Sequence, residues 1–216
     1  MIPTSPSGRA LKISAIGLFV LLSVLCKAMP YIFMSWGWNL EADDVRSYLW
    51  NFSPMLPLAV ISGCSLSSRW GVLLPVFTWL AGDLAIWVSS GRLDWAFYPH
   101  QPLMLCLVAV LFGMGHLIGT KIPAQTWTDR CCVNVGSGLL GAILFFLISN
   151  FGIWAIGNEF LYAQTWQGLI ECYVNALPFF RNSLISTVLF APILTLIFTA
   201  RESAQSGQPE LAAAMK

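Results

Sequence analysis

Apolar runs of about 20 residues, long enough to cross a bilayer core as a helix, recur along this chain. One run extends from Ile13 to Ile32, and a later one from Val133 to Trp154. Of the 216 residues, 57% are hydrophobic and 10% are charged. Because soluble domains carry about 25% charged residues, the sequence predicts an all-α integral membrane protein.

Six apolar runs predict one bundle of six transmembrane helices. We expect these helices at about residues 13–29, 51–66, 70–88, 102–118, 133–154 and 182–200. The second run is short and carries Pro54 and Pro57 in its first turns, a pattern that either borders a cavity or forms a tilted helix without a ligand. Residues 157–181 are rich in aromatic side chains and predict an interfacial or partly re-entrant segment. A basic leader (1–12) and a polar tail (201–216) flank the membrane domain (13–200).

The distribution of Lys and Arg predicts the orientation, because cytoplasmic loops carry the excess of positive charge. With both ends inside, seven cationic residues lie on the inner face and four on the outer face. The inner set is Arg9, Lys12, Arg69, Lys121, Arg130, Arg201 and Lys216, and the outer set is Lys27, Arg46, Arg92 and Arg181. We therefore expect cytoplasmic termini, with the loops 33–50 and 157–181 on the outer face.

Two polar residues within apolar runs are the main candidates for a ligand site. Asn150 lies near the end of a span, where an amide is costly unless it finds a partner. It either bonds a helix end or a neighbouring helix, or it faces a ligand in a pocket lined by Phe151 and Trp154. Asp83 is a carboxylate inside a span, which suits binding of a ligand amine or hydroxyl, or proton transfer. Its alternative is pairing with Arg69, Asn51 or a helix end.

Several function classes lack support in the sequence. The net charge of +1 gives no reason to expect nucleic acid, and the six Cys show no zinc-ligand spacing. There is no Gly-x-x-x-x-Gly-Lys loop, so either ATP-driven transport takes its energy from a partner, or the protein works by a passive or trapping mechanism. The acid–base candidates are Asp83, His100, Glu159 and Glu171, and no spacing links them into a catalytic motif. We therefore expect no enzyme and no resident cofactor.

A set of short motifs resembles an uncharacterised family of small bacterial membrane proteins, known by a domain-of-unknown-function label. The motifs lie between about Lys27 and Phe198. They are Asn51-Phe52-Ser53-Pro54, Gly82-Asp83, Ser149-Asn150-Phe151-Gly152-Ile153-Trp154, Tyr162, Thr165, Gly168-Leu169, Cys172-Tyr173 and Ala176-Leu177-Pro178-Phe179-Phe180-Arg181-Asn182. Two positions depart from the pattern: Gly82 replaces an expected Ser, and Cys64 replaces a small apolar residue.

That family looks like the substrate-binding S components of energy-coupling factor (ECF) vitamin transporters, by size, six spans and outer-face layout. The resemblance implies a bacterial inner-membrane protein with a small-molecule pocket in its outer half, closed by the loop 33–50. Ala15 and Gly17 on the first helix would face a coupling subunit. One solitary group of S components binds cobalamin through a Cys thiol, which makes Cys64 a candidate cobalt ligand, since thiolates bind transition metals. The alternative for Cys64 is a packed thiol.

These observations leave three hypotheses. The first is a protein that captures a vitamin-like molecule, cobalamin among the candidates, and Trp154 and Trp166 would stack on a planar ligand. The second is a structural or assembly protein without a cavity, and the third is a membrane enzyme. For the first, the candidate ligand-binding residues are Asn51, Asp83, Asn150, Trp154, Tyr162, Trp166, Tyr173 and Asn182. The expected partners are the lipid bilayer, a small molecule and a coupling subunit.

Overall fold

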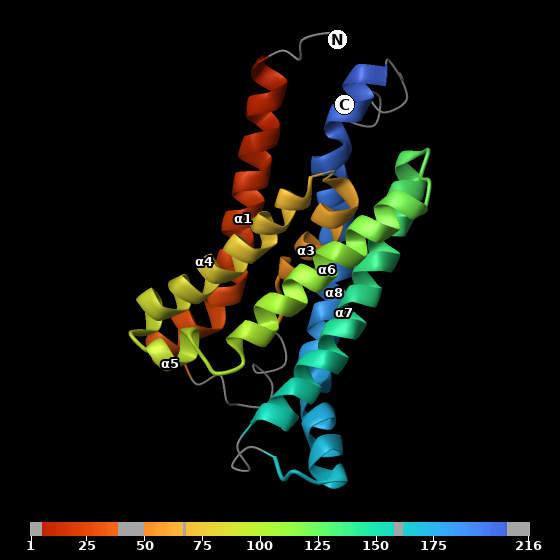
Figure 1. Cartoon of the computed structure of the whole chain (residues 1–216). Coiled ribbons are helices and arrows are strands. Elements are labelled where there is room, and N and C mark those ends of the chain that lie inside the picture. Colours follow the sequence, from red (N-terminus) through yellow and green to blue (C-terminus); the bar gives the residue numbers. More distant parts are fainter. Residues whose placement is uncertain (1–5, 39–49, 67, 158–161, 207–216) are drawn as a thin grey trace.

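The protein is all-helical over the residues that the computed structural model describes, which are 6–38, 50–66, 68–157 and 162–206 (Figure 1). The helices are α1 (Pro6–Ser35), α3 (Met55–Ser65), η1 (Arg69–Val72), α4 (Leu73–Ser90), α5 (Leu93–Ala96), α6 (Gln101–Lys121), α7 (Trp127–Ile156) and α8 (Trp166–Ser206). Five segments in this part of the chain are long and apolar enough to cross a membrane: Ala10–Ser35, Arg69–Ser90, Leu93–Lys121, Trp127–Ile156 and Trp166–Thr199. The predictions of an all-α fold and of a multi-pass membrane protein are confirmed.

The short helix α3 forms the centre of the bundle. Met55 to Gly63 are all buried, and α3 packs against α4, α6, α7 and α8. At 11 residues it is about 16 Å long, roughly half the thickness of a bilayer core. An apolar surface on every side is typical of a helix buried within other helices. The second predicted span is thus a core helix surrounded by longer ones.

Glycines bring α3 and α6 into backbone contact. A Cβ on Gly63 would lie 2.1 Å from the carbonyl oxygen of Phe112, and one on Gly115 would lie 2.0 Å from that of Val60. A Cβ on Gly119, one turn after Gly115, would lie 2.5 Å from the carbonyl oxygen of Cys64. Small residues at this spacing let membrane helices approach closely, so these glycines fix the position of α3.

Helix α8 corrects one prediction, because residues 166–181 continue into the last span as helix. Pro178 and Pro192 lie inside this helix of 41 residues. Neighbouring helices tolerate such prolines in a membrane by re-satisfying the backbone, and α7 packs along α8. Residues 166–181 are therefore the first part of a long helix and form no separate re-entrant segment.

The outer helix boundaries also extend beyond the prediction. Helix α1 begins at Pro6, within the expected leader, and α8 ends at Ser206, within the expected tail. These two helix ends lie at the same end of the bundle (Figure 1), where Lys12 Nζ donates to the carbonyl of Phe198 at 2.8 Å. The central part of the loop 33–50, at 39–49, and Glu159 lie outside the described residues.

Candidate functional site

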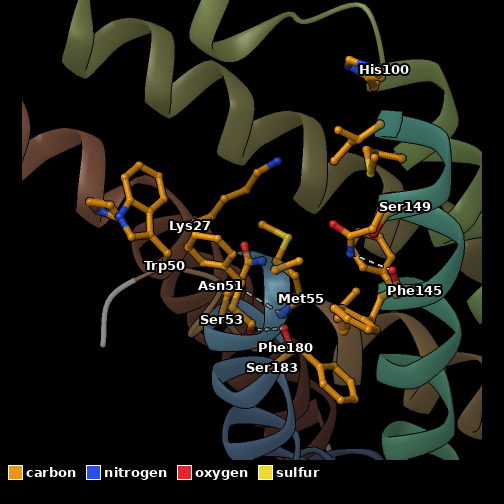
Figure 2. A pocket seen from close by; sticks show the side chains of 18 of the residues that line it. Lys27, Trp50, Asn51, Ser53, Met55, His100, Phe145, Ser149, Phe180 and Ser183 are labelled. Atoms are coloured by element: carbon orange, nitrogen blue, oxygen red, sulfur yellow. Dashed lines mark hydrogen bonds between the residues drawn. The ribbon is translucent and has the colours of Figure 1, made fainter. Parts of the chain in front are cut away.

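A cavity of about 430 Å³ lies among the helices in the half of the bundle away from the start of α1 and the end of α8. Its walls come from the helices α1, α3, α4, α5 (Leu93–Ala96), α6, α7 and α8 and from the segments that precede α3, α6 and α8. In Figure 2, Lys27 and Trp50 approach from one side, and Phe145 and Ser149 from the other. Aromatic rings supply much of the wall: Tyr31, Trp50, Trp79, Trp95, Tyr98, Phe145, Phe146, Phe179 and Phe180.

A buried ion pair stands on one wall of the cavity. Lys27 Nζ lies 2.5 Å from Asp83 Oδ1 and donates to the carbonyl of Trp79 at 3.2 Å. The same ammonium lies 3.9 Å from the centroid of the Trp79 ring. Gln101 Nε2 donates to Asp83 Oδ2 at 2.8 Å. Both carboxylate oxygens and the ammonium therefore have partners within the protein, which a fully buried carboxylate requires.

This pair corrects two predictions. Lys27 was expected among the outer-face charges, but it lies within α1, and its side chain is only 15% exposed. For Asp83, the alternative to ligand binding or proton transfer was pairing with Arg69, Asn51 or a helix end, whereas its partner in the structure is Lys27. The signal was present in the sequence, because a lone Lys and a lone Asp in different apolar runs commonly pair within a membrane.

Gly82 makes room for this lysine. A Cβ on Gly82 would lie 2.6 Å from Lys27 Cδ and 3.1 Å from Met55 Cε. A serine, the residue expected at this position from the family pattern, would have to displace the lysine stem. The departure at Gly82 and the path of Lys27 are thus physically linked.

Two buried nitrogen atoms that line the cavity lack hydrogen-bond partners. They are Trp79 Nε1 and His100 Nε2, and they are the only such side-chain atoms among the residues described. The Tyr98 hydroxyl lies beside the Trp79 indole but does not complete a hydrogen bond with it. Since buried polar groups nearly always have partners, both atoms mark a place where a ligand group could bind.

Four of the predicted ligand residues line the cavity: Asn51, Asp83, Asn150 and Tyr162. Asn51 adopts a left-handed backbone conformation (φ 59°), which Asn tolerates better than most residues. Asn150 Nδ2 donates to the carbonyl of Phe146, one turn earlier, at 2.7 Å. The amide of Asn150 therefore bonds its own helix and also faces the cavity.

The other four predicted ligand residues do not line the cavity. Trp154 Nε1 donates to the carbonyl of Ala163 at 3.0 Å, and the Tyr173 hydroxyl donates to that of Leu147 at 2.7 Å. Trp166 is 76% exposed. Asn182 Nδ2 donates to the carbonyl of Trp50 at 2.9 Å, so Asn182 holds a segment of the cavity wall from behind.

Cys64 does not reach the cavity. It lies at the opposite end of α3, where its Sγ is 3.8 Å from Ser137 Oγ. No cluster of three or more His, Cys, Asp or Glu side chains that could hold a metal occurs in the described ranges. The contact with Ser137 agrees with the packed-thiol alternative, and the geometry gives no support to Cys64 as a cobalt ligand at this site.

Comparison with known proteins gives one match. The model of a family of unknown function, DUF6580, matches residues 9–210. No curated protein and no solved structure matches the chain.

Proposed function

This chain belongs to the DUF6580 family of unknown function, and we propose that it is a membrane protein that captures a vitamin-like small molecule for uptake. The observation that carries the proposal is the cavity of about 430 Å³ with two unpartnered nitrogen atoms in its wall. Small-molecule sites are typically cavities of about 300–1,000 Å³, mostly apolar, with a few convergent polar groups.

The cavity favours capture over a purely structural role. A structural bundle would bury its polar side chains against one another, as the pair Lys27 and Asp83 does. In such a bundle, leaving Trp79 Nε1 and His100 Nε2 without partners beside a cavity would cost stability with no compensating gain. An enzyme is also less well supported, because both oxygens of Asp83 already accept hydrogen bonds.

The proposed topology is a bundle of six helices in a bacterial inner membrane, with both termini cytoplasmic. The charge argument supports this orientation, because without Lys27, which pairs with Asp83, the predicted outer set is Arg46, Arg92 and Arg181 against seven cations in the predicted inner set. In this orientation the cavity lies in the outer half, where a solute from outside would enter. The layout is analogous to that of ECF S components.

Energy for uptake would come from a partner, since the sequence carries no ATP-binding loop. Helix α1 offers a contact surface for such a coupling subunit, because Gly17 is exposed and a Cβ there would meet nothing within 4 Å. Cobalamin is one candidate ligand, but the proposal does not depend on it, since Cys64 lies outside the cavity.

The test is native mass spectrometry of the detergent-purified protein mixed with a vitamin panel that includes cobalamin. We expect one compound to be retained at one copy per chain. Ser149→Phe, which fills the cavity from α7, should abolish retention, whereas Ile148→Phe, on the exposed side of the same helix, should not. Retention of no compound, or equal retention in Ser149→Phe, would shift the assignment to the structural alternative.

A further inference from the structure

Among the residues that the structure describes, none offers the cavity an unpaired charge for a ligand. Its charged lining residues are Lys27 and Asp83, and each already neutralises the other. A charged ligand would have to break that pair or lie in an apolar site without a counter-ion, and both alternatives are costly. The electrostatics therefore favour an uncharged ligand.

The hydrogen bonds that remain unmade specify part of the ligand's chemistry. Trp79 Nε1 is a donor only, so it requires an acceptor. His100 Nε2 donates or accepts, depending on which ring nitrogen carries the proton. A ring nitrogen or carbonyl oxygen on the ligand would satisfy the indole, and a second polar atom would satisfy the imidazole. A plain hydrocarbon would satisfy neither atom.

The aromatic walls specify the ligand's shape. In one group of rings, the centroid of Tyr31 lies 5.1 Å from that of Trp50 and 5.6 Å from that of Trp95. In a second group, the rings of Phe146 and Phe180 stack with their centroids 4.4 Å apart. All five rings line the cavity. A wall this rich in aromatic rings favours a ring system, which can stack on or pack edge-to-face against them, over a branched aliphatic molecule.

We propose that the cavity selects an uncharged, flat nitrogen heteroaromatic molecule and discriminates against charged forms of the same ring. This inference rests on the proposed capture function and names its ligand class. The pair Lys27 and Asp83 acts as the discriminating element, because these two side chains are the charged groups in the described part of the cavity wall and each is already the counter-ion of the other.

The experiment is affinity-selection mass spectrometry with matched compounds on a common ring: nicotinamide against nicotinate, pterin against pterin-6-carboxylate, and lumichrome as a larger neutral probe. We expect neutral members to be retained at least tenfold more than their carboxylates. Trp79→Phe keeps the ring and removes the donor, so it should weaken retention about tenfold. Trp87→Phe, on the same helix but outside the cavity wall, should leave retention unchanged.

A second variant tests the discriminating element directly. Asp83→Asn keeps the shape and the contact with Gln101 but leaves Lys27 without its counter-ion, so carboxylate retention should rise. Equal retention of charged and neutral members by the native protein, retention of none, or a folded Asp83→Asn that gains no carboxylate binding would overturn the inference. A carboxylate that the native protein retains and Ser149→Phe loses would overturn it while leaving the capture function intact.

Discussion

Polar side chains are buried both in the contact between α7 and α8 and in the cavity wall. In the contact they are hydrogen-bonded, whereas two polar atoms of the cavity wall are not. In the contact, Asn134 Nδ2 donates to Thr195 Oγ1 at 2.9 Å, and Thr195 Oγ1 donates to the carbonyl of Ala191 at 2.8 Å. In the cavity wall, Trp79 Nε1 and His100 Nε2 make no hydrogen bond. Burial of a polar group alone therefore does not point to a site in this protein, whereas the two unpartnered atoms are the basis of the proposed one.

The ion pair of Lys27 and Asp83 shares one property with each region: it lines the cavity, and its hydrogen bonds are made within the protein. Asp83→Ala should give the largest effect, a loss of about 3–5 kcal/mol in unfolding free energy, because it leaves Lys27 as an uncompensated buried charge. Thermal or denaturant unfolding in detergent measures the loss. The double variant Lys27→Met, Asp83→Leu should recover most of it. If Asp83→Ala were as stable as the native protein, the ion pair would contribute nothing to stability.

The backbones of α3 and α6 approach closely at glycines, which lets the stability of a tightly packed contact be measured. Gly115→Ala should cost about 1–3 kcal/mol, because the new Cβ would lie 2.0 Å from the carbonyl oxygen of Val60. Gly113→Ala is the matched control on the same helix, since a Cβ there meets nothing within 4 Å. It should be neutral or slightly stabilising, because Ala has the higher helix propensity. Equal melting temperatures for the two variants would show that α3 and α6 can separate without cost.

The sequence predicted the helices well because long apolar runs have one stable form in a bilayer. It predicted the site less well because ligand-facing residues depend on how distant helices meet. Lys27 reads as an interfacial charge until α4 brings Asp83 beside it. Trp79 was not among the predicted ligand residues, although it is 9% exposed and lines the cavity. The missing partner of its indole cannot be seen from residue types, because it follows from the space that the packed helices leave.

The α7–α8 contact gives the next effect in size. Asn134→Ala should cost about 1 kcal/mol, the usual contribution of a buried hydrogen bond, because it removes the donor to Thr195. Thr195 keeps its bond to Ala191, so the loss should remain small. Ser14→Ala, at an exposed position of α1, is a control that should leave unfolding unchanged. A loss no greater than in this control would mean that satisfied amides here contribute nothing to stability.

The smallest effect is expected where the buried polar atom has no partner. His100→Phe removes the unpartnered Nε2 and keeps a ring at the start of α6, so the empty protein should change in stability by no more than about 0.5 kcal/mol. Binding should respond differently: retention of a neutral heteroaromatic probe should fall several-fold, because the imidazole no longer contributes its hydrogen bond. The same protein preparation supplies both measurements, by unfolding in detergent and by affinity selection. A large loss of stability with unchanged retention would place His100 with Asn134, as a structural residue, and would remove it from the ligand site.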